Sequence, residues 1–253
     1  MSIVFIGAGN LATSLAWTLK QAGHTLLQVY SRTTESAAML AERLGCTFVT
    51  DFHDINCEAD VYIYAVRDEV YASLPAFECK ADSVHLLTSG SVPYGALRAG
   101  EHHGVIYPFQ SFSKQQPISD FSDIPIMIEG EDEFALDCSH RLAASISNGV
   151  YESTNESRAR LHLAGVLANN FSNCMYALAE EQLQKAGLPF SILLPLIDET
   201  ARKVHSLSPR VAQTGPASRA DKTILEHQLS LLDTEEKKQI YQLISNDIMR
   251  HSL

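Results

Sequence analysis

The stretch Ile3-Val4-Phe5-Ile6-Gly7-Ala8-Gly9-Asn10-Leu11-Ala12 decides the fold of this chain. A run of apolar, partly β-branched residues ends abruptly at two glycines, and a segment with helical patterning follows. This is the strand–turn–helix context of the G-x-G-x-x-G/A dinucleotide fingerprint, with Ala12 in the third small position. We therefore expect the chain to begin with a dinucleotide-binding unit.

The small residues of this turn meet the requirements of pyrophosphate binding. Gly7 allows the tight turn off the strand, and Gly9 lets the backbone approach a diphosphate without a Cβ clash. The free N–H groups near Asn10 and Leu11 then face the phosphates at the positive end of the helix. Together with Ala8, these residues form the expected pyrophosphate site.

The end of the second strand indicates which dinucleotide is bound. Residues 26–30 are followed by Ser31-Arg32-Thr33, where NAD-binding units place an Asp or Glu on the ribose hydroxyls. A carboxylate would repel a 2′-phosphate, whereas Arg32 can pair with it through charge-assisted hydrogen bonds. The sequence therefore predicts NADP, held by Ser31, Arg32 and Thr33. The alternative is a solvated loop arginine beside an N-capping hydroxyl.

Strands and helices alternate in the first part of the chain, and helices alone fill the rest. Further strands are expected at 26–30, 47–49, 60–66, 83–88, 104–107 and 125–129, and helices at 11–22 and 34–44. This alternation predicts an α/β fold with a doubly wound, mostly parallel Rossmann sheet in a domain of residues 1–152. Residues 153–253 are expected to form an all-helical domain, with helices near 154–186, 189–205, 217–232 and 234–250.

The first helix of the second domain is long and apolar around much of its surface. Its apolar residues include Leu161, Leu163, Val166, Leu167, Phe171, Met175 and Leu178. A helix that is apolar on several sides needs more than one packing partner. We therefore expect a homodimer that shares this helix through the helical domain.

Composition argues against several classes of partner. The formal net charge is −11 and basic residues are scattered, which disfavours a nucleic acid or an anionic membrane surface. No apolar run is long enough to span a bilayer, and the first residues lack a signal-peptide pattern. The five cysteines are widely spaced, so we expect buried free thiols in a cytoplasmic protein, with neither disulfides nor a metal site.

Ligands of doubly wound sheets bind beyond the carboxyl ends of the strands. These ends are expected to place Ala65 and Val66 against the cofactor, and Ser89 and Gly90 at the edge of the nicotinamide pocket. The alternative for the Ser89 segment is a plain turn. Residues 107–112, which combine aromatic rings with an amide and a hydroxyl, suit either a pocket wall or packing at a joint between domains.

Polar residues recur along the long helix. His162, Asn169 and Asn173 lie at i, i+7 and i+11 and are expected to share one face. Such residues need partners, which are either other protein groups or a substrate. His162 is the candidate proton donor, with a structural histidine as the alternative, and Asn169 or Asn170 could orient a carbonyl or imine substrate.

Two other polar segments are assigned without a firm role. His102 and His103 are expected in a surface turn. Arg219 and Asp221 could reach the substrate or a partner subunit, or could form an internal ion pair near a helix start.

With these motifs in view, the whole chain resembles a group of NADP oxidoreductases that join a Rossmann-like domain to an all-helical domain of unassigned function. They are relatives of pyrroline-5-carboxylate reductase and of the 6-phosphogluconate dehydrogenase superfamily. The resemblance is carried by the glycine fingerprint, Ser31-Arg32-Thr33, Ser89-Gly90-Ser91, Pro108 and the Gly-Pro-Ala-Ser-Arg-Ala-Asp segment at 215–221. It implies NADP binding, an active site between the domains and a dimer built through the helical domains.

One position departs from a related branch. β-Hydroxyacid dehydrogenases carry a Lys three residues before a paired Asn-Asn on this helix, and here Val166 occupies that position before Asn169-Asn170. The resemblance therefore implies a site without the usual lysine acid/base.

The leading hypothesis is an NADPH-dependent reductase that transfers hydride to a small carbonyl or imine compound at the cleft between the domains. His162, Asn169, Asn170 and Ser89 are its candidate catalytic residues. The alternative is a non-catalytic NADP-binding sensor or scaffold dimer.

Overall fold

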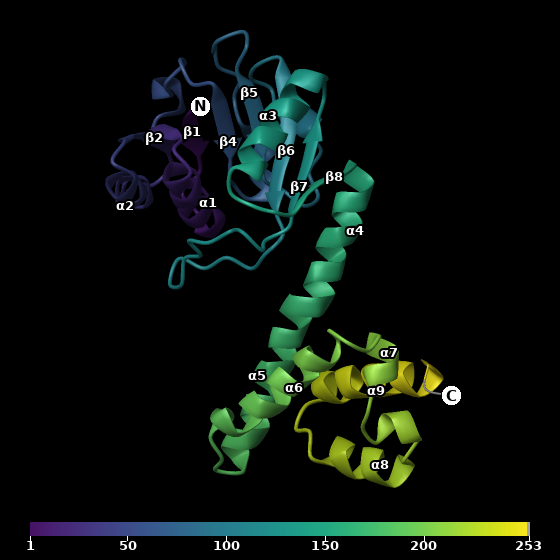
Figure 1. Cartoon of the computed structure of the whole chain (residues 1–253). Helices are drawn as coiled ribbons and strands as arrows, with labels where there is room; N and C mark the ends of the chain where they lie inside the picture. Colours follow the sequence, from purple (N-terminus) through teal and green to yellow (C-terminus); the bar gives the residue numbers. More distant parts are fainter. Residues whose placement is uncertain (252–253) are drawn as a thin grey trace. The chain divides into compact units, whose positions relative to one another are not determined.

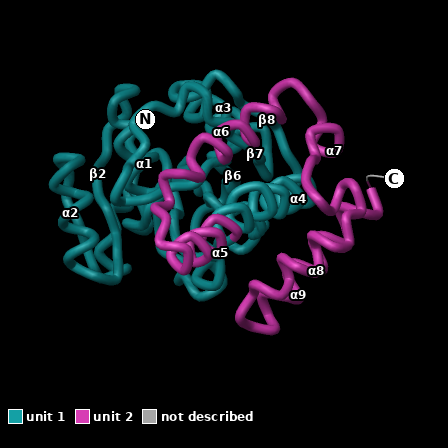
Figure 2. The backbone as a smooth tube through the Cα atoms, turned by 90° about the horizontal axis from the view of Figure 1, so that it is seen from below, with its two compact units in different colours: residues 1–174 teal, residues 175–253 magenta. Residues whose placement is uncertain are grey.

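The structure is a computed structural model that describes residues 1–251. It divides into two compact units, Met1–Cys174 and Met175–Leu253 (Figure 2). Helices were expected to replace the alternating pattern after residue 152, but the division lies further along the chain. The start of the long helix belongs to the first unit because Arg158 on this helix pairs with Glu129 of the sheet. The expected domain boundary stays a prediction.

The first unit is built on one mostly parallel sheet, which confirms the predicted fold class (Figure 1). Its order is β3-β2-β1-β4-β5-β6-β7-β8, and only the β6–β7 pair is antiparallel. The strands are β1 (Ser2–Ile6), β2 (Thr25–Tyr30), β3 (Thr47–Val49), β4 (Val61–Tyr64), β5 (Val84–Leu87), β6 (His102–Pro108), β7 (Ile126–Gly130) and β8 (Val150–Glu152).

Central strand β1 sends alternate residues to the two faces of the sheet, as the period of a strand requires. Ile3 and Phe5 pack in a core with α1 (Asn10–Gln21), α2 (Thr34–Leu44) and α3 (Glu133–Ala144). Val4 and Ile6 face a second core, which is covered by loops and the 3₁₀ turns η1 (Phe52–Asp54), η2 (Asp68–Ser73) and η3 (Tyr94–Ala96). Helices α1, α2 and α3 therefore pack on one face of the sheet.

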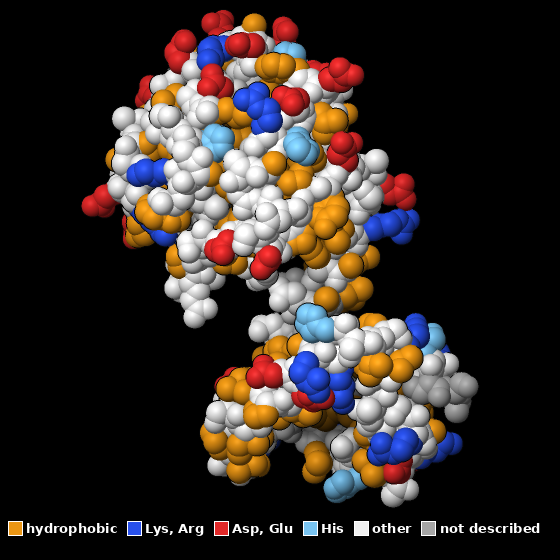
Figure 3. Space-filling model, viewed as in Figure 1, with side chains coloured by type: hydrophobic (Ala, Val, Ile, Leu, Met, Phe, Trp, Pro, Cys, Tyr) orange, Lys and Arg blue, Asp and Glu red, His pale blue; other side chains and the backbone are white. Residues whose placement is uncertain are grey.

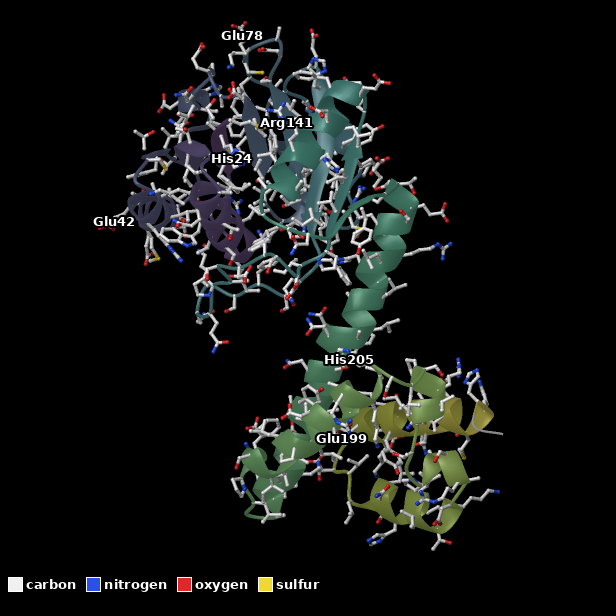
Figure 4. The ribbon with its side chains drawn as sticks, viewed as in Figure 1. His24, Glu42, Glu78, Arg141, Glu199 and His205 are labelled. Carbon is white, nitrogen blue, oxygen red and sulfur yellow. The ribbon has the colours of Figure 1, made fainter. Side chains whose placement is uncertain are left out.

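Near the chain start, His24 links the end of α1 to the end of α3. Its Nε2 lies 3.0 Å from Ser145 Oγ, and the side chain is labelled with Arg141 of α3 in Figure 4. Burial, the N-terminal ammonium and Arg141 lower the pKa of His24.

Two predictions about this unit are wrong. His102 and His103 begin β6 rather than occupying a turn, and each is half-buried against a carboxylate. His102 Nδ1 lies 2.7 Å from Asp132, and His103 Nδ1 lies 2.7 Å from Glu131. Those carboxylates follow β7, so no local sequence signal joins them to the histidines.

The second wrong prediction concerns the thiols. All five cysteines are free, but only Cys138 is buried, and Cys57 and Cys174 are exposed. Cys174 lies on the long helix in a stretch with few covering residues. Cysteine is usually buried, so the exposure of Cys174 could not be predicted from its residue type.

The helical part begins in the first unit and continues in the second. Helix α4 (Asn155–Gly165) passes into a π-helical segment, η4 (Val166–Phe171), and then into α5 (Ser172–Lys185). The remaining elements are η5 (Phe190–Leu193), α6 (Leu194–Lys203), α7 (Pro209–Ala212), η6 (Ala217–Arg219), α8 (Lys222–Ser230) and α9 (Glu235–His251). Across residues 1–251, none of the helices combines the length and apolarity that a membrane span requires.

The second unit buries little of itself. Between residues 175 and 251, only Ala217 and Ser245 are buried. Hydrophobic side chains are spread over its visible face (Figure 3), and Leu196 is 62% and Leu243 70% exposed. The described part of this unit therefore leaves much of its apolar surface exposed.

Candidate functional site

The first turn has the backbone geometry that the fingerprint predicts. Gly7 adopts φ +117°, and a Cβ there would collide with the carbonyl of Ala65. The turn is fixed to both neighbouring strands, since Gly7 N donates to Tyr30 O at 2.8 Å and Ala65 N donates to Ile6 O at 2.8 Å. The ends of β1, β2 and β4 therefore meet at this turn.

The start of α1 is free to bind an anion. Gly9 is its N-cap and provides no side-chain hydrogen bond, and the first turn contains no acidic residue. Gly9, Asn10 and Leu11 are not buried, and a Cβ on Gly9 would meet no protein atom closer than 4.0 Å. A glycine here keeps open the space in front of the helix N-terminus, which fits a diphosphate.

The polar side chains that follow β2, those of Ser31, Arg32 and Thr33, are also free of side-chain partners among the described residues. Arg32 is exposed and has no ion pair within residues 1–251, and no side-chain hydrogen bond of Ser31 or Thr33 occurs there. The Ser31 backbone N–H donates to Val49 O at 3.3 Å, which holds the cluster beside β3. The side chains that were expected at a 2′-phosphate are thus available for one.

A pocket of about 370 Å³ contains most of the expected catalytic residues. It is lined by Tyr107, Phe109, Gln110, Ser111, His162, Gly165, Val166, Ala168, Asn169 and Asn170. The segment after β6 and the helix after β8 thus come together within the first unit. None of the lining side chains is Lys, Arg, Asp or Glu.

The helix changes its geometry at the two asparagines. Asn169 and Asn170 lie in η4, the π-helical segment, which has a wider turn than an α-helix. Asn173, which α-helical spacing placed on the same face, lies in α5 and does not line the pocket. A π-helical turn cannot be recognised from apolar periodicity, and such turns are frequent at functional sites.

His162 is held from two sides. Its Nδ1 lies 2.9 Å from the hydroxyl of Tyr107. On the other side, Gly90 is so close that an added Cβ would lie 2.7 Å from His162 Cγ. Burial, with a contribution from the charge of Asp68, raises the pKa of Tyr107, and Arg158 opposes this.

The Ser89 turn supports the pocket without lining it. Ser89 is buried, and its Oγ accepts hydrogen bonds from the backbone N–H groups of Ser91 and Val92 at 3.0 and 2.9 Å. Its hydroxyl therefore stabilises the turn that brings Gly90 against His162.

Sequence reasoning missed Arg158, which joins this turn to the sheet. The fully buried guanidinium is paired with Glu129 of β7 and donates to Ser89 O at 3.1 Å and to Val92 O at 2.9 Å. It also donates to Asn155 Oδ1 at 3.0 Å. Arg158 lies one helical turn before His162, so it positions the helix that carries the histidine.

The remaining candidates have other surroundings. Val166 lines the pocket, so the position that bears a lysine in β-hydroxyacid dehydrogenases faces the site here without an amine. Asp221 caps α8 by accepting from Ile224 N at 3.2 Å, and Arg219 is exposed. No ion pair between Arg219 and Asp221 occurs among the described residues.

Comparisons with known proteins match both parts of the chain. Residues 2–88 match the family model described as "NADP oxidoreductase coenzyme F420-dependent", and residues 124–248 match a domain of unknown function, DUF2520. No curated protein matches the sequence.

Solved structures match over nearly the full length. A Bacteroides fragilis protein, provisionally named an NADP oxidoreductase, is 42% identical, with 98% of each chain covered and a TM-score of 0.93. Protein TM1727 of Thermotoga maritima is 23% identical, with 99% of each chain covered and a TM-score of 0.77. A 1-pyrroline-5-carboxylate reductase of Streptococcus pyogenes is 13% identical over 99% of this chain and 98% of its own, with a TM-score of 0.62. The last two likenesses show the fold alone.

Proposed function

This chain belongs to the NADP oxidoreductase family that the Bacteroides fragilis protein represents, and from that premise we propose that it is an NADP(H)-dependent reductase of a small carbonyl or imine compound. The observation that carries the proposal is the pocket at His162, Asn169 and Asn170, which lies in the same compact unit as the glycine turn.

The cofactor part of the proposal rests on free donors at the turn. The diphosphate is bound by the N–H groups that Gly9 leaves accessible at the start of α1, and Gly7 and Ala65 fix the turn. The 2′-phosphate is bound by Arg32 with the hydroxyls of Ser31 and Thr33. NADPH bound there supplies the hydride.

The pocket residues suit a neutral, polar double bond. The carboxamides of Asn169 and Asn170 orient the substrate, and the imidazole of His162 delivers a proton to its oxygen or nitrogen. Phe109 and Tyr107 keep water away from the reacting atoms. A site lined without a charged side chain favours a small carbonyl or imine over a phosphorylated substrate.

Calorimetric titration followed by a turnover assay tests this function. We expect NADPH to bind, and NADPH oxidation with at least one member of a panel of small ketones, aldehydes and cyclic imines. Coenzyme F420 belongs in the panel because the matched family model names it. His162→Ala should lose turnover and keep NADPH binding; the absence of heat with NADPH and NADH would overturn the proposal.

A non-catalytic NADP sensor or scaffold is the second candidate. Val166 favours it, since the pocket lacks the amine that serves as acid/base in a related branch. Tight NADPH binding without oxidation across the whole panel would support the sensor over the reductase.

We also propose that the helical unit forms a homodimer. An apolar groove of about 730 Å³ runs between α5, α8 and α9. Within this groove Gln182 Nε2 is buried, and it has no hydrogen-bond partner among residues 1–251. Sedimentation should give a dimer that Leu231→Glu weakens, because Leu231 lines this groove, whereas Met39→Glu, at a similarly exposed apolar residue of α2, should not weaken it. A monomer at micromolar concentration would overturn this proposal.

A further inference from the structure

The direction of the hydrogen bond between Tyr107 and His162 depends on which imidazole nitrogen carries the proton. Tyr107 Oη lies 2.9 Å from His162 Nδ1, and it makes no other hydrogen bond within residues 1–251. If Nδ1 carried the imidazole proton, the Tyr107 oxygen would accept it, and the hydroxyl proton would then need a second acceptor, which residues 1–251 do not provide. If the proton lies on Nε2, the hydroxyl donates to Nδ1 and both groups are satisfied by the one bond.

The tyrosine keeps its proton under ordinary conditions. Burial raises the pKa of Tyr107, and the nearby charge of Asp68 acts in the same direction. The Tyr107 hydroxyl therefore remains a donor at neutral pH.

The ring of His162 has little freedom to turn away from this bond. Gly90 leaves no room beside the ring, since an added Cβ would lie 2.7 Å from Cγ and Nδ1. The Gly90 turn is fixed by the hydrogen bonds from Arg158 to Ser89 O and Val92 O. The Tyr107 and His162 rings lie edge to face with centroids 6.2 Å apart. The far nitrogen, Nε2, makes no hydrogen bond among the described residues, and Asn169 and Asn170 line the same pocket.

We propose that Tyr107 is a positioning residue of this site, because its hydroxyl fixes neutral His162 with the proton on Nε2 and presents that N–H to the substrate. The inference rests on the proposed function. It adds that the substrate places an acceptor, the oxygen or nitrogen of its double bond, against His162 Nε2. Within residues 1–251, no carboxylate is hydrogen-bonded to this imidazole, and a phenol hydroxyl orients it instead.

Nitrogen-15 spectra of the histidine side chains test the proposal without substrate or cofactor. The signal of His162 is assigned as the one that disappears in His162→Gln. In the wild-type protein above the titration of the imidazole, we expect Nε2 protonated and Nδ1 unprotonated. In Tyr107→Phe we expect a mixture of both tautomers, while Tyr151→Phe, which removes an exposed hydroxyl from β8, should leave the tautomer unchanged.

A turnover assay adds an independent measurement. Tyr107→Phe should lower kcat about tenfold with little change in KM, which corresponds to the loss of one neutral hydrogen bond. The Tyr107→Phe, His162→Gln double variant should be no slower than His162→Gln alone, because the tyrosine acts through the histidine.

Each result has a clear meaning. A wild-type His162 protonated on Nδ1, or a tautomer that Tyr107→Phe does not change, would overturn the proposal even if the enzyme proves to be a reductase. If NADPH does not bind but the Nε2 tautomer is found, the proposed function fails while the positioning role stands.

Discussion

Gly90 lies directly against the imidazole of His162, so that an added Cβ would be 2.7 Å from both Cγ and Nδ1. Contacts this short force one of the two groups to move. The turn that carries Gly90 is held by Arg158, and His162 is held by Tyr107. A side chain at position 90 therefore displaces the ring from the pocket.

We expect Gly90→Ala to lower kcat at least tenfold with the Kd for NADPH unchanged, because a 1 Å misplacement of a proton donor is costly to the rate. Stopped-flow fluorescence of NADPH oxidation measures this. Gly95→Ala is the matched control, since a Cβ there meets no atom within 4 Å. Equal rates for the wild-type protein and Gly90→Ala would show that the ring does not need its observed position.

The buried pair of Arg158 and Glu129 makes a second prediction. The guanidinium is fully buried and the carboxylate is 16% exposed, so removing one partner leaves a charge in a poorly solvated place. Arg158→Met should lower the free energy of unfolding by about 3–5 kcal/mol. Urea denaturation followed by circular dichroism measures it.

The double variant Arg158→Met, Glu129→Met should recover part of this loss, because no unpaired charge remains. Arg160→Met is the control on the same helix, where the pair with Glu156 is 80% exposed on both sides and should matter little. If the double variant loses more free energy of unfolding than the two single variants lose together, this explanation is wrong.

Much of the fold could be predicted from local patterns. The glycine turn, the strand ends and α2 follow from apolar runs and punctuating glycines, and β3 and α2 have the expected bounds. Strand β8 and helix α3 carry weaker signals: β8 is a three-residue strand at the sheet edge with two of its residues exposed. The crossover from β4 to β5 is a 3₁₀ turn, which has no helical period to detect.

Sequence patterns predicted the grouping only of those site residues that lie on a single helix. His162, Asn169 and Asn170 come from one helix, and they line one pocket, although the π-helical segment changes their spacing. Tyr107 belonged to the expected pocket wall, but its bond to His162 spans 55 residues. Arg158 and Glu129 are 29 residues apart on different elements, and no local pattern joins them.

Arg32 gives a prediction about cofactor choice. Its guanidinium is exposed and without an ion pair among the described residues, so a 2′-phosphate would be its partner. Arg32→Glu should weaken NADPH binding about 10- to 100-fold, since a charge-assisted hydrogen bond is replaced by repulsion. NADH binding should change much less, and calorimetry with both nucleotides measures the difference.

The control for this variant is Arg98→Glu, which makes the same change of net charge at another exposed residue. It separates a local contact from a general effect of the charge of the protein. If Arg32→Glu weakens NADPH and NADH equally, Arg32 does not contact the 2′-phosphate.

His85 predicts how stability depends on pH. The side chain is fully buried on β5, with Nδ1 2.8 Å from Tyr64 Oη and Nε2 3.2 Å from Ser83 Oγ and 3.3 Å from Cys79 Sγ. Burial, and then the charges of His103 and His102, lower the pKa of His85 to about 3.

The pKa of His85 in the folded protein is thus below its unfolded value of about 6.5, and the unfolded chain binds the extra proton between these values. The contribution of neutral His85 to the free energy of unfolding is complete above about pH 6.5. It declines as the pH falls toward 3, by up to about 1.4 kcal/mol per pH unit. In His85→Gln we expect a lower free energy of unfolding at pH 7 but a shallower decline between pH 6 and pH 4. Urea denaturation at several pH values measures both slopes, with His140→Gln, at an exposed residue of α3, as the matched loss of a histidine. Parallel slopes for the wild-type protein and His85→Gln would mean that the buried imidazole accepts its proton without unfolding.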